Sequence, residues 1–386
     1  MNGGLIKGWC PGAHRPMAAE DGLILRIRPP GGRLSSAQAL GLADLARAHG
    51  QGVLALTTRA NVQMRGIAPA EHAELLKELA ALNLLDADET TERSRNIAVT
   101  PFWRTGDGTL ELAAALADGL ANLRGLPAKF GFAVDTGPAP VLGGTSADIR
   151  FERATDGTLL LRSDGAPQGQ PVQTAEAVAR ALALADWFIA SGGVKDGRGR
   201  MRTHLATGHT PPPGLAGTTP SAAALPEPLP GPCATGVLAA FAFGELQAET
   251  LDALAGLSGE IRLTPWRMLL LPGLATLPPL PGMILDPASP LPRVYACTGA
   301  PGCGQALSET RALAAGLASH LPPGMRLHVS GCAKGCAHPA AADVTLTATT
   351  AGFSLIRNGA VSAAQERTGL DPESLLRHPG QIFGAC

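Results

Sequence analysis

Four of the seven cysteines in this 386-residue chain form two close pairs within its last quarter. Five residues separate Cys297 from Cys303 and three separate Cys332 from Cys336, in segments rich in glycine. Small residues between thiolates let the backbone curl around a metal group and donate N–H groups to it. An odd cysteine count with two tight pairs fits metal ligation in a reducing compartment better than a disulfide framework.

The spacing of the pairs indicates which metal group to expect. A structural zinc site favours two to four residues between the ligands of both pairs, and the gap between Cys297 and Cys303 is wide for that. We therefore predict one [4Fe-4S] cluster held by four thiolates, with zinc or unligated buried thiols as the alternatives. The isolated cysteines are Cys10, Cys233 and Cys386; we interpret Cys10 as a small buried hydrophobe.

Length and charge restrict the class of protein. A chain of this length buries more than one core, so we expect two to four domains. A net charge of −1 gives no global electrostatic case for nucleic acid or an anionic membrane as partner. No uninterrupted apolar run reaches the length of a membrane span, and residues 1–15 lack the apolar stretch of a signal peptide. We therefore expect a cytoplasmic, multidomain protein.

The order strand, helix, strand occurs twice in the sequence. In residues 22–67, two apolar runs flank an amphipathic helix that starts after a serine pair, and residues 236–274 repeat this order. Such a recurrence predicts an internal duplication of a β-α-β half-domain. The alignment places Leu56, Thr57 and Gly66 over Leu263, Thr264 and Gly273.

Each predicted half-domain is followed by a longer stretch of mixed helix and strand. The first stretch has helix signals at residues 111–123 and 174–190 and ends in a proline-rich linker at residues 209–232. The second stretch has a helix signal at residues 307–320, between the two cysteine pairs. Only the second copy therefore carries the predicted metal ligands.

At the cysteines the sequence resembles a known family. C-x5-C followed by S-G-C-x3-C-x-x-P is similar to the cluster motif of the sulfite and nitrite reductases. The resemblance covers nearly the whole chain and implies an α+β fold. That fold consists of duplicated ferredoxin-like half-domains plus two α/β domains, the second carrying the cluster. It also implies that the cluster lies against an iron tetrapyrrole, with Cys336 as the bridging ligand.

We expect four domains in the order that this resemblance implies. Residues 1–80 form an N-terminal segment with the first half-domain, and residues 85–225 form an α/β domain without a cluster, ending in the linker. Residues 226–285 form the second half-domain, and residues 286–386 form the cluster domain.

Three further stretches resemble the part of that family that cradles the tetrapyrrole. Residues 57–63 look like T-x-R-Q-N/G-x-Q, residues 95–97 look like R-N-[IV], and residues 126–130 look like L-P-R-K-F. Arginine holds carboxylates through paired hydrogen bonds and lysine holds them as a point charge, although each residue taken alone is better explained as an ordinary surface cation or ion pair. The resemblance implies tetrapyrrole binding by Arg59, Asn61, Arg95 and Lys129.

One departure from the reductase pattern affects the expected reaction. Reductases of this family commonly carry a second lysine two places after the one matched by Lys129, and that place is Gly131 here. Six-electron reduction of sulfite or nitrite is therefore in doubt. Residues 7–17 instead resemble the branch of the family that forms precorrin-3B in aerobic cobalamin biosynthesis. That branch implies O₂-dependent hydroxylation of precorrin-3A at C20, with formation of a lactone.

The same resemblance implies a mononuclear non-haem iron besides the cluster. The sequence identifies neither its ligands nor a catalytic residue, and we interpret His14 and His338 as loop histidines satisfied by the backbone. No G-x-G-x-x-G lies between a strand and a helix, since residues 197–202 lack the third glycine. We therefore expect an external electron donor, a ferredoxin or an NAD(P)H-dependent reductase.

Two other functions compete with this interpretation. A sirohaem-dependent sulfite or nitrite reductase would purify with sirohaem bound, whereas the oxygen-dependent enzyme binds its precorrin as substrate. A non-catalytic iron–sulfur electron carrier or redox sensor is the alternative of another class. A carrier gains nothing from a duplicated cradle, so substituting Arg59, Arg95 and Lys129 would leave its cluster potential nearly unchanged.

Overall fold

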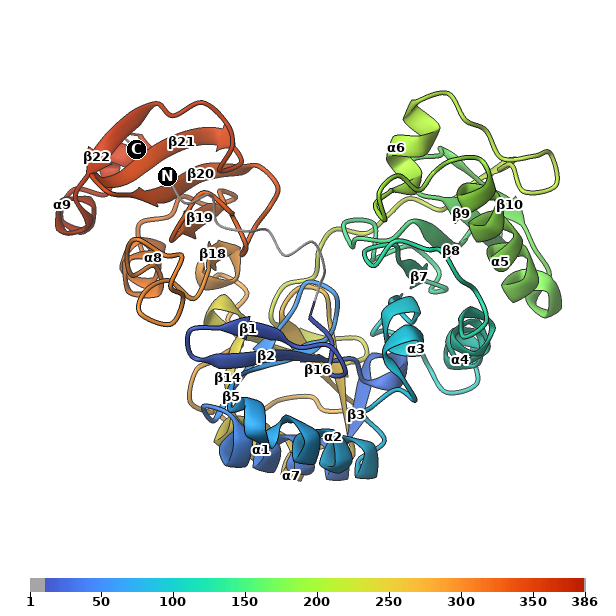
Figure 1. Cartoon of the computed structure of the whole chain (residues 1–386), viewed down its shortest axis with the longest axis horizontal. Helices are drawn as coiled ribbons and strands as arrows, with labels where there is room; N and C mark the ends of the chain where they lie inside the picture. Colours follow the sequence, from blue (N-terminus) through green and yellow to red (C-terminus); the bar gives the residue numbers. More distant parts are fainter. Residues whose placement is uncertain (1–10, 385–386) are drawn as a thin grey trace.

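The computed structural model describes residues 11–384 and arranges them as a central body with one lobe on either side (Figure 1). Cys10 and Cys386 lie outside the described residues, as do the first four residues of the 7–17 motif. Helices and sheets form separate layers throughout the described chain, so the predicted α+β class is confirmed.

The two central sheets share one plan and exchange one strand each. In the first sheet the order is β1-β2-β5-β4-β14, and in the second it is β12-β13-β16-β15-β3, with β17 paired to β13. The short strand β3 pairs antiparallel with β15 of the other half, and β14 pairs in the same way with β4. Each half therefore completes the sheet of the other. The bounds are β1 (Met17–Ala19), β2 (Gly22–Ile27), β3 (Arg33–Ser35), β4 (Val53–Leu56), β5 (Val62–Ile67), β12 (Gly231–Cys233), β13 (Gly236–Phe241), β14 (Glu245–Gln247), β15 (Glu260–Leu263), β16 (Met268–Pro272) and β17 (Met283–Ile284).

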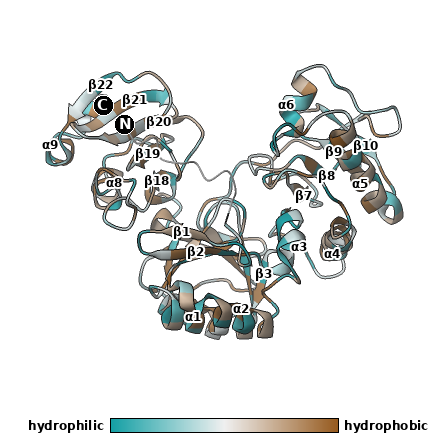
Figure 2. Ribbon diagram, in the orientation of Figure 1, coloured by the Kyte–Doolittle hydropathy of each residue, from teal (hydrophilic) through white to brown (hydrophobic). Residues whose placement is uncertain are grey.

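Three helices cover one side of this central body: α1 (Ser36–His49), α2 (His72–Ala81) and α7 (Ala248–Leu257). The serine pair predicted to start a helix does so, because the Ser35 side chain and Gln38 form a capping box. Helices α1 and α7 pack against each other, and their apolar faces join one buried cluster drawn from both halves. Figure 2 shows α1 and α2 with both polar and apolar positions, as expected for helices that bury one face.

The predicted duplication is visible in the turn geometry of the two halves. Ala60 and Arg267 occupy equivalent places in the β4–β5 and β15–β16 turns, and both have left-handed backbones, with φ of 53° and 59°. Gly66 and Gly273 match in the same way, at 77° and 76°. Because a positive φ is uncommon for residues other than glycine, the shared value at Ala60 and Arg267 supports the alignment made from sequence.

One lobe is a six-stranded sheet in the order β11-β10-β9-β8-β7-β6, in which β6, β7 and β8 run parallel. The helices predicted in this stretch are present. The proline-rich segment contributes only two short edge strands, β11 and β12. The bounds are β6 (Ile97–Val99), β7 (Phe132–Val134), β8 (Ile149–Arg153), β9 (Leu159–Ser163), β10 (Gln168–Pro171), β11 (Thr219–Pro220), α3 (Glu89–Ser94), α4 (Thr109–Leu120), α5 (Thr174–Ala190) and α6 (Met201–Ala206).

The other lobe is a five-stranded sheet in the order β18-β19-β20-β21-β22. Its main helix, α8 (Arg311–Ala318), has eight residues and is therefore shorter than the helix predicted at residues 307–320. The reason is that the Leu307 amide donates to the Gly331 carbonyl (2.8 Å) and the Ser308 carbonyl accepts from Ala300 (3.0 Å), which ties this segment to the cysteine loops. The bounds are β18 (Val294–Ala296), β19 (Leu327–Ser330), β20 (Ala342–Thr349), β21 (Gly352–Gly359), β22 (Arg367–Leu370), α8 (Arg311–Ala318), α9 (Pro372–Arg377) and α10 (Gly380–Phe383).

Within residues 11–384, no helix is at once long enough and apolar enough to cross a membrane.

Candidate functional site

The four cysteines lie on two loops at one edge of the β18–β22 sheet. Strands β18 and β19 are parallel neighbours, with Ala296 opposite Val329. Cys297 directly follows β18, and Cys332 is the second residue after β19. Because parallel strands end at the same sheet edge, both cysteine pairs leave the sheet side by side, as ligand-binding loops commonly do.

Backbone contacts hold these two loops together. The Gly331 amide donates to the Cys297 Sγ atom at 3.2 Å, which is the kind of N–H contact that stabilises a cluster thiolate. The Thr310 hydroxyl donates to the Cys297 carbonyl at 2.6 Å. A Cβ atom on Gly331 would lie 2.7 Å from the Cβ of Ala306, so only glycine fits between the loops.

The four thiols fit a cluster better than a single metal ion. All four cysteines are free, with Cys336 the most exposed. Partial burial of its thiol raises the pKa of Cys336, and the thiols of Cys332, Cys297 and Cys303 raise it further, so the four groups lie within electrostatic reach. A zinc ion at about 2.3 Å from each sulfur would require a tighter group. Within residues 11–384, no three such side chains converge closely enough to hold one metal ion. Cluster ligation by these four thiols stays a prediction.

The resemblance also implies a mononuclear iron, and the described residues offer no ligand set for it. Among residues 11–384, no three His, Cys, Asp or Glu side chains converge closely enough to hold one metal ion. His14 contacts the Asp86 carbonyl at 2.7 Å, and His338 contacts the Ala341 carbonyl at 3.3 Å. Both are loop histidines with backbone partners, as interpreted from the sequence, and the described residues do not fit this iron.

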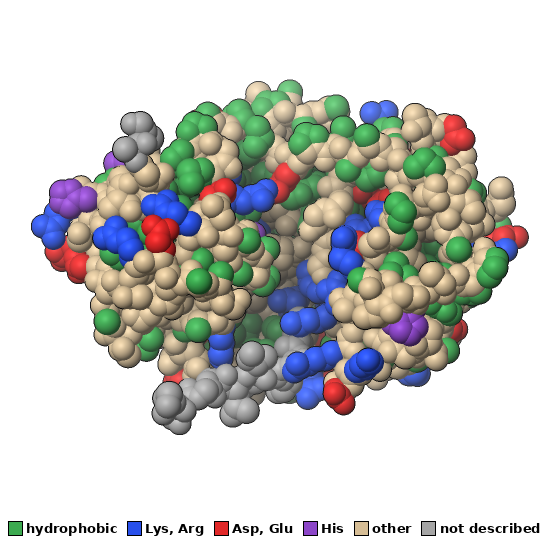
Figure 3. Space-filling view, turned by 90° about the horizontal axis from the view of Figure 1, so that it is seen from above, with side chains coloured by type: hydrophobic (Ala, Val, Ile, Leu, Met, Phe, Trp, Pro, Cys, Tyr) green, Lys and Arg blue, Asp and Glu red, His purple; other side chains and the backbone are tan. Residues whose placement is uncertain are grey.

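Lys and Arg side chains gather along the hollow between the two lobes (Figure 3). Arg59, from the β4–β5 turn of the central body, reaches into the β6–β11 lobe. Its Nη2 atom lies 3.3 Å from the Ser146 hydroxyl and 3.4 Å from the Lys129 carbonyl. Arg200 approaches the same hydroxyl from the segment before α6, at 2.9 Å. Two guanidinium groups, those of Arg59 and Arg200, therefore converge on the Ser146 hydroxyl, and Arg59 also contacts the backbone of Lys129. We call Arg59, Arg200 and the neighbouring Lys129 the basic cradle.

Arg200 is the member of the basic cradle that the sequence analysis missed. It lies in residues 197–202, which drew attention only as an incomplete nucleotide motif. Nothing in the local sequence separates Arg200 from Arg198 or Arg202. The fold alone selects it, because its guanidinium is the one in this segment that contacts Ser146 and Asp148.

The other two predicted cradle residues serve local structure. Arg95 forms a two-bond ion pair with Asp86, at 2.6 and 2.8 Å, and donates to the Arg28 carbonyl at 2.7 Å. Asn61 is buried, and its backbone N–H donates to the Thr57 hydroxyl (3.2 Å), which shapes the turn that carries Arg59. Tetrapyrrole contacts by Arg95 and Asn61 stay predictions.

Gly131 occupies a crowded position. A Cβ atom there would lie 3.2 Å from the Asn96 carbonyl and 3.3 Å from the Ser146 carbonyl. Both neighbours are backbone atoms, and the Asn96 carbonyl is already fixed as the acceptor for Phe132. A lysine at this position, as the reductase pattern has it, would require the loop to move.

A separate pocket lies behind the Lys129 segment, between α3 and the loop after α4. It is lined by Arg93, Arg124 and Phe130, among others, and holds about 200 Å³. Pockets that enclose a drug-sized ligand measure roughly 300–1,000 Å³. This pocket is too small for a tetrapyrrole, so the hollow between the lobes is the candidate site.

Comparisons with known proteins agree with this arrangement. Residues 15–82 match the family model described as nitrite/sulfite reductase ferredoxin-like half domain. A precorrin-3B synthase of Sinorhizobium sp is 27% identical over 397 residues, covering 92% of this chain and 84% of the relative. A ferredoxin–nitrite reductase of Synechococcus elongatus is 28% identical over 395 residues, covering 84% and 75%.

Among solved structures, the NirA protein of Mycobacterium tuberculosis has a similar fold. The TM-score is 0.59 at 17% identity, over 92% of this chain and 79% of that one, so the likeness concerns the fold alone. The chain therefore contains a half-domain of the kind found in nitrite and sulfite reductases and has a fold like that of NirA. Over most of its length it is similar to both a precorrin-3B synthase and a nitrite reductase, which are oxidoreductase-type enzymes.

Proposed function

We propose that the chain is a precorrin-3B synthase that hydroxylates precorrin-3A at C20 with O₂ and closes a lactone. Gly131 is the observation that carries this proposal, because it stands where the reductases have a second lysine and a side chain there would meet atoms only 3.2–3.3 Å from its Cβ, which would have to shift. The relative named precorrin-3B synthase, which matches over 92% of this chain, supports it.

The proposed reaction needs electrons and protons as well as O₂. Hydroxylation takes one oxygen atom from O₂ and reduces the other to water, which consumes two electrons and two protons. A [4Fe-4S] cluster held by Cys297, Cys303, Cys332 and Cys336 would supply electrons singly from an external ferredoxin or NAD(P)H-dependent reductase. The described residues provide no ligand set for a mononuclear iron.

The chain's own contribution is to bind and orient the substrate. Precorrin-3A carries a rim of carboxylates, and Arg59 and Arg200 present positive charge beside the Ser146 hydroxyl, next to the segment that carries Lys129. Guanidinium groups grip carboxylates through two parallel hydrogen bonds, which fixes orientation as well as affinity. The basic cradle would thus hold the macrocycle in one pose.

A sirohaem-dependent nitrite or sulfite reductase is the second candidate. The similarity to the ferredoxin–nitrite reductase favours it. In that case, sirohaem would be a resident cofactor and Cys336 its bridge to the cluster. The two candidates therefore differ in what the purified protein contains.

Anaerobic purification with iron, sulfide and haemochrome assays separates the two. About four irons and four sulfides per chain without sirohaem, followed by O₂-dependent conversion of precorrin-3A to a product heavier by one oxygen, is the expected result. Stoichiometric sirohaem together with nitrite or sulfite reduction would reject the synthase proposal.

Paired cysteine variants test the cluster itself. Cys336→Ser should lose most of the iron and sulfide, since it removes one of four thiolate ligands. Cys233→Ser is the matched control, because Cys233 lies in β12 of the central body and should leave both contents unchanged. Equal iron in both variants would contradict the assigned ligands.

A further inference from the structure

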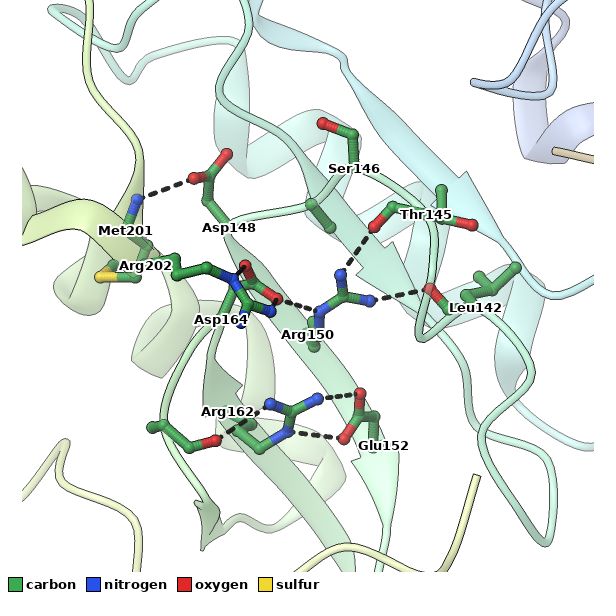
Figure 4. A network of polar contacts seen from close by, with 12 residues as sticks. Leu142, Thr145, Ser146, Asp148, Arg150, Glu152, Arg162, Asp164, Met201 and Arg202 are labelled. Atoms are coloured by element: carbon green, nitrogen blue, oxygen red, sulfur yellow. Dashed lines mark hydrogen bonds and ion pairs between the residues drawn. The ribbon is translucent and has the colours of Figure 1, made fainter. Parts of the chain in front are cut away.

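Asp148 lies at the start of β8 with its carboxylate fully buried. Its Oδ1 atom accepts from Arg200 Nε at 2.9 Å and from the Met201 amide at 2.8 Å. Its Oδ2 atom accepts from the Gly131 amide at 3.0 Å. Figure 4 shows Asp148 beside Met201 and Ser146, within a network of buried charges on β8 and β9. One carboxylate therefore joins two segments that are far apart in sequence.

Both of these segments carry a cation of the basic cradle. Gly131 follows Lys129 by two residues, and its carbonyl also accepts from the Asp148 amide at 2.7 Å. Arg200 is held directly by the carboxylate. The spacing between the Lys129 segment and Arg200 is thus set through Asp148, and a shift of this residue would move both.

Arg200 keeps part of its hydrogen-bonding capacity. Its Nε donates to Asp148, its Nη1 donates to Ser146 at 2.9 Å, and its Nη2 donates to the Ala147 carbonyl at 3.4 Å. A guanidinium has five N–H donors, so within the described part of the chain two are left. The side chain is 35% exposed, which leaves those donors within reach of a ligand.

We propose that Asp148 is a positioning residue for the tetrapyrrole: it holds Arg200 and the Lys129 segment at the spacing at which they grip carboxylates of the substrate. This inference rests on the proposed function, because it assumes a carboxylated tetrapyrrole in the hollow. Asp148 itself does not contact the ligand. Its effect on binding passes through Arg200 and through the backbone at Gly131.

Burial favours the neutral form of Asp148, and its partners favour the charged one. Desolvation raises the pKa of Asp148, while the Arg200 guanidinium and the amides of Met201 and Gly131 act in the opposite direction. A charged Asp148 partly neutralises Arg200, but the remaining members of the cradle keep the hollow cationic. Removing the charge without changing the shape is therefore an informative substitution.

Asp164 offers a matched control in the same network. It is also buried, at 6% exposure, and it pairs with Arg150 at 2.9 Å and Arg202 at 3.1 Å (Figure 4). Its carboxylate binds Arg150 and Arg202, neither of which belongs to the basic cradle. Asp148→Asn and Asp164→Asn thus perturb similar buried ion pairs, but only the first touches the basic cradle.

The test measures binding of uroporphyrin, a porphyrin with eight carboxylates, to the full-length, cluster-loaded protein by fluorescence titration. Asp148→Asn should raise the dissociation constant about tenfold, whereas Asp164→Asn should change it less than about threefold. In a double-mutant cycle, Asp148→Asn added to Arg200→Gln should cost little more than Arg200→Gln alone, since the two residues act as one unit. A merely structural role would give additive losses.

Arg200→Lys leaves Asp148 intact and covers the case in which Asp148→Asn does not fold. A lysine keeps the charge, but it cannot contact Asp148 and Ser146 and also reach a carboxylate of the ligand. The Arg200→Lys variant should therefore bind uroporphyrin as weakly as Arg200→Gln does. Full binding by Arg200→Lys, or equal losses in the Asp148 and Asp164 variants, would overturn the positioning role. If Arg59→Gln and Arg200→Gln also bind normally, or the unmodified protein does not bind, the proposed function fails as well.

Discussion

At the scale of single residues, His328 stands out as a buried histidine whose ring nitrogens lack hydrogen bonds to the described residues. It lies in β19, four residues before Cys332, and is 0% exposed. Neither ring nitrogen has a hydrogen-bond partner within residues 11–384. The hydroxyls of Thr347 and Ser354, opposite each other on β20 and β21, are also buried and have no hydrogen-bond partner in the described part of the chain. This face of the sheet therefore disfavours any added charge.

That environment predicts a pH-dependent stability. Burial, together with His338, lowers the pKa of His328 to about 4, against about 6.5 in an unfolded chain. Between these values the unfolded chain binds a proton that the folded one does not. The free energy of unfolding should therefore keep its full value above pH 6.5 and fall by about 3 kcal/mol as the pH drops towards 4.

The His328→Leu variant isolates this contribution. It should be at least as stable as the unmodified protein at pH 7, because it removes an unsatisfied polar group, and should lose less stability on acidification. Urea unfolding at pH 7 and pH 5 measures the difference, with the exposed His320→Leu as control. The same pH slope in both variants would show that His328 is not the source.

At the scale of elements, the exchange of β3 and β14 joins the two halves. Leu246 of β14 lies opposite Leu54 of β4 and is 2% exposed, so a residue of the second half fills the core of the first. Leu246→Ala should lower the free energy of unfolding by about 3 kcal/mol, the usual cost of a buried cavity. Leu257→Ala in α7, where the leucine is 41% exposed, should cost under about 1 kcal/mol.

Chemical denaturation followed by circular dichroism compares these two leucine variants. The expected outcome is a clear loss for Leu246→Ala and little change for Leu257→Ala. Equal midpoints would mean that β14 contributes little to the sheet of the first half, and that the halves fold without the exchanged strand.

At the scale of the whole molecule, Arg65 connects the central body to the cysteine loops. It pairs with Asp21 through two bonds of 3.0 Å and donates to the Gly302 carbonyl at 2.8 Å and the Thr298 hydroxyl at 3.2 Å. Gly302 and Thr298 both lie between Cys297 and Cys303. The first half-domain thus holds a loop more than 230 residues away in sequence.

Arg65→Gln should therefore speed cluster loss to a chelator by about tenfold, because hydrogen bonds from a charged donor are worth about 1.5–3 kcal/mol. The decay of cluster absorbance measures this rate. Arg47→Gln is the matched control, since its ion pairs with Asp44 and Asp252 lie at the surface, where solvent screens them. Similar decay in both variants would contradict a role for Arg65 in holding the loop.

The sequence by itself determined the features that depend on neighbours along the chain. Cysteine spacing gave the predicted cluster ligands, a capping serine gave the start of α1, and the aligned Gly66 and Gly273 gave the duplication. These signals are local, because a loop, a cap or a turn depends on a few consecutive residues.

Only the tertiary structure decided which elements and side chains meet. The exchange of β3 and β14 joins strands more than 190 residues apart, and no local pattern encodes it. Helix α8 starts late because Leu307 bonds to Gly331 instead of continuing the helix. Arg200 and Asp148 enter the candidate site for the same reason: their 52-residue separation closes only when β8 and the segment before α6 pack together.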